Sequence, residues 1–168
     1  MDDSSEVFDV VDSENRVIGQ ATRGEVHAKG LLHRSVHIWV FNSRGELFLQ
    51  KRAMTKDENP GYWDSSASGH LNAGEGYRTS AHRELMEELG ISGELQFFMK
   101  FPASRETHWE HVETYLCRTD QKITLNLLEI SEGRFWPISD LKKAVHSRPG
   151  QFTSTSHLFF GSYLKSMA

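Results

Sequence analysis

The chain has 168 residues, a formal net charge of −4 and one cysteine, Cys117. Its length predicts a single domain, residues 1–168, with room for a sizeable core. The acidic balance argues against binding of a nucleic acid polymer, and no apolar run approaches the length of a membrane span. A lone cysteine cannot form an internal disulfide, and the acidic, polar N-terminal residues are unlike a signal peptide. We therefore expect a cytoplasmic protein that does not bind membranes, with Cys117 packed in the core.

Apolar periodicity and turn residues predict short strands mixed with about two main helices. The expected strands are 7–18 as a hairpin (within about 7–20), 36–41, 46–51, 94–101, 112–118 and 123–128. The expected helices are 78–89, 141–147 with Ser139 or Asp140 as N-cap, and 156–166. Residues 19–32 are expected to be irregular or briefly helical, and 54–68 to form a polar loop. This pattern predicts an α+β or α/β sandwich.

The most informative stretch is 69–91, where a glycine-rich loop leads into a helix that Gly90 ends. At about 100° per residue, Glu84 and Glu88 lie one turn apart with Glu87 beside them. An apolar stripe on another side can be buried, consisting of Ala81, Leu85 and Leu89. One side of the helix therefore anchors it, while another carries three carboxylates.

Clustered carboxylates repel one another unless cations neutralise them, and Mg2+ or Mn2+ prefers such oxygen ligands. Arg83 lies four residues before Glu87 and can pair with it, or with Glu75 on the loop. The alternative is a solvated helix face with ordinary glutamate–arginine pairs.

The stretch resembles the Nudix box, the signature of the Nudix hydrolases, at every fixed position. These positions are Gly69, Glu75, Arg83, Glu84, Leu85, Glu87, Glu88, Gly90 and Ile91. The resemblance extends loosely over about 7–147. It implies the Nudix fold, in which a mixed central β-sheet is sandwiched between α-helices.

The same resemblance implies that Mg2+ or Mn2+ is held by Glu84, Glu87 and Glu88, with the backbone carbonyl of Gly69 as a further ligand. It implies Glu84 as the general base, although the family can supply the base from elsewhere. Glu75 and Arg83 would support catalysis by fixing the glutamates.

Residues outside the box complete the expected site. A further metal ligand would be Glu110 or Glu113. We favour Glu110 as the ligand and expect Glu113 to bind the substrate. Because they are three apart in a strand, they point to opposite faces. Arg52 and Lys56 are expected to bind phosphates, and Trp109 to stack on a base unless it packs in the core.

A second resemblance, to isopentenyl-diphosphate isomerase, spans the segment from about Leu32 to His70. That enzyme binds metal through histidines near His27, His33 and His70 and uses a cysteine where this chain has Ser68. Because the hydrolase box is intact, we expect the histidines to be structural or loop residues.

These observations predict a Nudix hydrolase that cleaves a small-molecule diphosphate, either a nucleoside diphosphate or a compound linked to one. Isomerase-like activity and a non-catalytic binding module are the alternatives. Dimers are frequent in the family, so a homodimer stays open.

Overall fold

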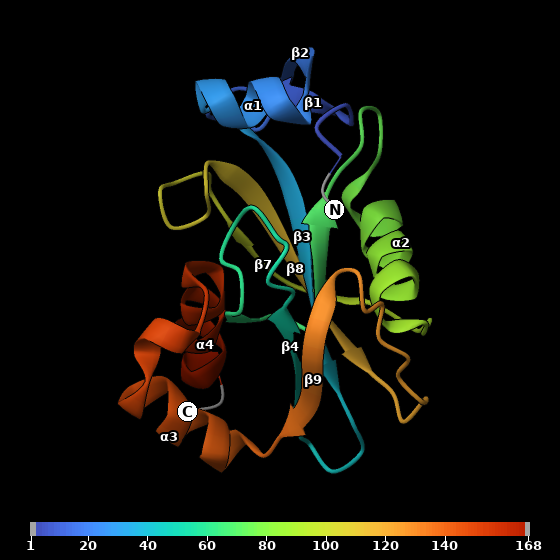
Figure 1. Cartoon of the computed structure of the whole chain (residues 1–168), viewed down its shortest axis with the longest axis vertical. Coiled ribbons are helices and arrows are strands. Elements are labelled where there is room, and N and C mark those ends of the chain that lie inside the picture. The colour runs from blue at the N-terminus through green and yellow to red at the C-terminus, as the bar shows by residue number, and fades with distance from the viewer. Residues whose placement is uncertain (1–2, 167–168) are drawn as a thin grey trace.

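The computed structural model describes residues 3–166 of the chain (Figure 1). The strands are β1 (Val7–Val11), β2 (Val17–Thr22), β3 (His33–Phe41), β4 (Leu47–Arg52), β5 (Trp63–Asp64), β6 (Ala67–His70), β7 (Gln96–Phe101), β8 (Glu110–Arg118) and β9 (Ile130–Trp136). The helices are α1 (Arg23–Lys29), α2 (Tyr77–Leu89), α3 (Ile138–Ser147) and α4 (Ser154–Ser166), with a 3₁₀ turn at Pro149–Gln151.

A seven-stranded mixed sheet forms the centre, with the strand order β5-β4-β3-β8-β7. The β3 and β8 pair is parallel, and the other pairs are antiparallel. One edge of β3 pairs with β8. The other edge pairs with β6 near the start of β3 and with β4 near its end. Strand β9 pairs with the other edge of β4. The expected N-terminal hairpin is present as the separate β1–β2 sheet, which lies with α1 at one end of the molecule (Figure 1).

Two buried clusters cover the two faces of the central sheet. On one face, the alternate β3 residues Val36, Ile38 and Val40 pack with the apolar stripe of α2. On the other, Trp39 and Phe41 pack with α3 and α4. Figure 1 shows the sheet between these helices. The α+β class and the sandwich of a mixed sheet between helices are therefore confirmed.

The face of β3 that carries Trp39 and Phe41 becomes polar toward the start of the strand. There the same face carries His33, Ser35 and His37, all of which are buried. In a strand whose other residues are apolar, buried polar side chains need partners or a ligand. This end of the sheet therefore holds the candidate site rather than core.

The structure corrects two expected elements near the C-terminus. Residues 123–128 are not a strand, because their backbone bonds to the end of α2, with the Thr124 and Asn126 amides donating to Leu89 and Glu88. The strand at this point is β9, which pairs with β4. Helix α3 begins earlier than expected, with Pro137 as N-cap, because the Asp140 amide donates to the Pro137 carbonyl.

Two regions expected to be mostly irregular contain short helices or strands. The region 19–32 holds the end of β2 and all of α1, and the expected loop 54–68 holds β5 and the start of β6. Cys117 is buried in β8. Within residues 3–166, every helix is too short or too polar to cross a bilayer.

Candidate functional site

Gly69 brings the acidic helix close to the sheet. This residue lies in β6, and a Cβ atom there would be 2.1 Å from a carboxylate oxygen of Glu84. Real Cβ atoms do not approach so closely, so any larger residue would push Glu84 away from the strand. The close approach explains why β6 has glycine at this position.

Glu84 and Glu88 are buried, with exposed fractions of 9% and 6%, whereas Glu87 is exposed. Glu88 accepts hydrogen bonds from the Ser68 amide (2.8 Å) and the Gln50 side chain (3.0 Å). Burial, followed by the neighbouring charge of Glu88, raises the pKa of Glu84 to about 8. Burial also raises the pKa of Glu88 to about 7. Burial thus outweighs the partners of these two carboxyls and disfavours their ionised forms, which is an arrangement that suits a bound cation.

Arg83 joins the box side chains into one network. Its guanidinium donates to both carboxylate oxygens of Glu75 at 2.9 Å, to Glu84 at 2.6 Å and to Glu87 at 3.3 Å. It also donates to the His70 carbonyl at 3.1 Å. Bidentate pairing of this kind fixes geometry as well as charge. Both pairs expected from the sequence, with Glu75 and with Glu87, are therefore present, and the Glu84 contact is additional.

A cavity of about 190 Å³ lies against this network, between α2, β6, the loop 53–62, the polar end of β3 and the residues that lead into α4. Most of the expected site residues line it: Arg52, Lys56, Gly69, Arg83, Glu84, Glu87, Glu88 and Glu110. Three expected site residues lie outside this lining: Glu75, Trp109 and Glu113.

These three have other surroundings. Glu75 pairs with Arg83, as expected for a supporting residue. Trp109 is 48% exposed rather than packed in the core. Glu113 accepts from the Tyr115 hydroxyl (2.5 Å) and pairs with Lys100 (3.3 Å), on the opposite face from Glu110.

The two cations expected to meet phosphates already have acidic partners. Arg52 donates to the Glu58 carbonyl (2.9 Å) and to Asp64 (3.4 Å). Lys56 forms an ion pair with Glu129. Both side chains line the cavity, so a phosphate could share or replace these contacts.

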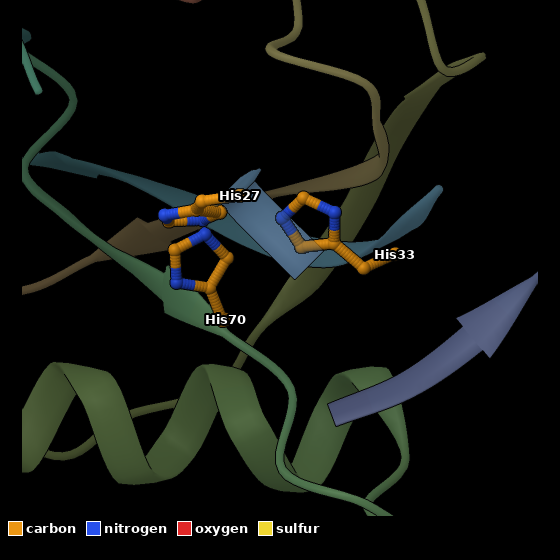
Figure 2. Close-up of side chains that lie close together, drawn as sticks. All are labelled: His27, His33 and His70. Atoms are coloured by element: carbon orange, nitrogen blue, oxygen red, sulfur yellow. The ribbon is translucent and has the colours of Figure 1, made fainter. Parts of the chain in front are cut away.

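Three histidines meet beside the cavity, as Figure 2 shows. His27 comes from α1, His33 from β3 and His70 from β6, and one nitrogen of each lies within 4.8 Å of those of the others. Glu110 of β8 accepts from His70 Nε2 at 2.8 Å and lies 3.4 Å from His33 Nε2. Among the described residues, the buried His27 Nε2 has no hydrogen-bond partner. We expected structural or loop histidines; the three lie in α1, β3 and β6, and their side chains form one cluster.

Glu110 and His33 shift one another's pKa values. Burial opposes ionisation of Glu110, but His70 and His33 together hold its pKa well below the usual range. Burial likewise opposes protonation of His33, but the Glu110 carboxylate, 3.4 Å from its Nε2, raises its pKa. Burial lowers the pKa of His27. Imidazole nitrogens with one carboxylate are donors that suit Zn2+, Mn2+ or Fe2+, so this cluster could hold a metal distinct from that of the box.

Several residues of the cavity lining were not predicted from the sequence. Arg23 of α1 is buried and lies 2.9 Å from His70 Nδ1, and His37 and Asp64 form part of the inner wall. Thr153 donates to Asp64 at 2.9 Å from the start of the C-terminal helix. The one available signal was Asp64, a charged residue directly after the aromatic pair Tyr62-Trp63. No local pattern marks the others, because tertiary packing brings them together.

Comparison with known proteins agrees with this geometry. The NUDIX domain family model matches residues 31–155. An isopentenyl-diphosphate Delta-isomerase of Photorhabdus laumondii is 33% identical over 153 residues, covering 88% of this chain and 86% of that protein. An uncharacterized Nudix hydrolase of Pseudomonas aeruginosa is 40% identical over 136 residues, covering 78% of each.

Among solved structures, DR0079 from Deinococcus radiodurans is similar, with a TM-score of 0.76 and 25% identity over 85% of this chain and 90% of that one. The fold, the complete box and the match over residues 31–155 agree. This chain belongs to the Nudix family.

Proposed function

We propose that the protein is a Mg2+- or Mn2+-dependent hydrolase that cleaves the diphosphate linkage of a nucleoside diphosphate or of a compound linked to one. The observation that carries this proposal is the buried pair Glu84 and Glu88, which face a polar cavity beside the exposed Glu87. Carboxylates of this kind fit hard divalent ions, which usually complete their shells with water and substrate phosphates.

The residues of the chain have separate tasks in this reaction. Glu84, Glu87 and Glu88 would hold the cations, which supply charge neutralisation and lower the pKa of water. Arg83 holds Glu84 and Glu87 in position, and Glu75 holds Arg83. We assign Glu84 the role of accepting the proton of the attacking water.

Arg52 and Lys56, which also line the cavity, would contact the phosphate oxygens. Attack at phosphorus would then yield a monophosphate and the remaining phosphorylated part or phosphate. Catalysis of this kind depends mainly on positioning and on stabilisation of developing charge.

The direct test measures phosphate and monophosphate release from a diphosphate panel with each metal. Glu84→Gln and Glu88→Gln should each lower kcat by at least about a hundredfold, because one cation ligand is lost. Glu94→Gln, an exposed residue that does not line the cavity, is the matched control and should retain full activity. Full turnover in both box variants would refute the assignment.

Isomerisation of isopentenyl diphosphate is the second candidate, and two observations favour it. The histidine cluster with Glu110 could hold a metal, and three relatives carry that name. However, Ser68 stands where the isomerase has its cysteine, and a serine hydroxyl is a much weaker acid than a thiol. Formation of dimethylallyl diphosphate without phosphate release would identify this activity. Tight binding without either product would instead indicate a non-catalytic module.

A further inference from the structure

The lining of the cavity is polar. Among residues 3–166, it consists of carboxylates, cations, imidazoles, amides, hydroxyl-bearing side chains and one glycine, Gly69. None of these described lining residues is aliphatic, phenylalanine, tyrosine or tryptophan. Ligand pockets are usually mostly apolar and of about 300–1,000 Å³, so a polar cavity of about 190 Å³ suits a compact, strongly hydrated ligand.

One hydroxyl in this wall lacks a partner. Ser35 is only 2% exposed and lines the cavity, and its Oγ forms no hydrogen bond within the described part of the chain. An unsatisfied buried polar group is unfavourable, and a ligand that bonds to it removes that penalty. The Ser35 hydroxyl is therefore a feature that a ligand would complete.

The surroundings of Ser35 show what kind of ligand group would fit. His70 lies opposite Ser35 in the β3–β6 ladder, and Ser68 lies opposite His37, so the four side chains share one face. Thr155, which is buried at the start of α4, also lines the cavity. Hydroxyl groups such as those of Ser35, Ser68 and Thr155 both donate and accept hydrogen bonds, as do the hydroxyls of a sugar.

The polar face of β3 and β6 adjoins the box glutamates through β6. The Ser68 amide donates to Glu88 at 2.8 Å, and Ser68 lies opposite His37, the next residue after Ser35 on this face. Glu88 and Ser35 also line the same cavity, so a ligand with its phosphates at the box can extend toward Ser35.

We propose that this cavity recognises a hydroxylated sugar that adjoins the diphosphate, and that Ser35 is one of the residues that bind it. The proposal rests on the proposed function. A nucleobase attached to the sugar lies outside the cavity and is not discriminated. An apolar isoprenoid chain is rejected, because it would desolvate polar groups without pairing them.

The test compares four substrates with Mg2+ present: ribose 5-diphosphate, ADP, CDP and dimethylallyl diphosphate. We expect kcat/KM values within about threefold for the first three and at least about 30-fold lower for dimethylallyl diphosphate. Ser35→Ala should lower kcat/KM about tenfold for the three ribosyl substrates and leave the value for dimethylallyl diphosphate unchanged. The melting temperature of this variant should not fall, because the hydroxyl has no partner to lose.

Ser162→Ala makes the same chemical change on α4, outside the cavity lining, and should change none of these values. Calorimetric binding of the four compounds supplies a readout that does not need turnover. If no compound is hydrolysed, the proposed function fails, but stronger binding of the ribosyl compounds that Ser35→Ala weakens still supports this inference.

Three results would overturn the inference while leaving diphosphate hydrolysis intact. Dimethylallyl diphosphate could be used or bound as well as ADP. One base could be preferred over the other, or over ribose 5-diphosphate, by more than tenfold. Ser35→Ala could leave every substrate unchanged, which would show that this hydroxyl contacts no ligand.

Discussion

Replacing Glu84 by glutamine should stabilise the metal-free protein at pH 8 while weakening its metal binding. Glu84 is buried, and its pKa is raised to about 8 by burial, then by the charge of Glu88, with Glu87 adding and Arg83 opposing. In the unfolded chain this carboxyl loses its proton near its ordinary value of 4.5. Between these values the folded state binds more protons, so the free energy of unfolding falls as the pH rises from about 5 to 8.

The magnitude follows from the two pKa values. A tenfold change in proton affinity corresponds to about 1.4 kcal/mol, so holding Glu84 ionised in the folded state costs on the order of 5 kcal/mol. This cost already includes the 2.6 Å contact with Arg83, which lowers the pKa of Glu84 and so opposes the shift. Because part of the carboxyl is still protonated at pH 8, we expect a gain on the order of 4 kcal/mol at this pH, or about 8–16 °C in Tm.

Chemical unfolding in EDTA from pH 5 to 8 measures this effect. The wild-type protein should lose stability across the window, whereas Glu84→Gln should give a flatter profile. Glu87→Gln, an exposed neighbour on the same helix, is the matched control and should stay within about 0.5 kcal/mol of wild type. Saturating Mg2+ should raise the Tm of wild type more than that of Glu84→Gln. A Glu84→Gln protein that is less stable than wild type at pH 8 without metal would refute the reasoning.

Three further outcomes are expected. The affinity for Mg2+, measured by calorimetry, should rise between pH 6 and 8, since protons on Glu84 and Glu88 compete with the cation; a flat profile would contradict the raised pKa values. Gly69→Ala should lower Mg2+ affinity and activity at least about tenfold while the circular dichroism spectrum is retained, because its Cβ would displace Glu84; normal metal affinity would argue against the close approach. If the histidine cluster binds metal, wild type should develop visible absorption with Co2+ and His70→Ala should not, since one imidazole and a partner of Glu110 are lost.

The sequence predicted those parts of the site whose geometry is local. The spacing of Glu84, Glu87 and Glu88 within one helix fixes their relative positions, and Arg83 reaches its partners within the same stretch. Helix α2 was expected at 78–89 and begins one residue earlier, at Tyr77. No strand pairing is needed to predict these contacts, because the helix itself brings the side chains together.

The inner half of the cavity could not be predicted in this way. The expected strand started at Val36, because His33-Arg34-Ser35 is too polar for an ordinary buried strand. In the fold, β3 does continue through these residues, since β8 pairs with it along its whole length and β6 covers its other edge. Hydrogen bonds to β8 and β6 satisfy the backbone of β3, so the strand continues even where its side chains no longer pack in the apolar core.

The polar start of β3 is also what separates the two ends of this sheet face. Where α4 covers the strand, Trp39 stacks on Phe159 with a centroid distance of 3.7 Å, and the face is core. Two residues earlier the strand presents His37, whose Nδ1 lies 2.8 Å from Ser65 Oγ, and the face becomes cavity wall. An apolar residue at position 35 or 37 would extend the core into the cavity. The polar residues at the start of β3 therefore have two effects. They hid this part of the strand from prediction by hydrophobic pattern, and they make room for a polar ligand beside the acidic helix.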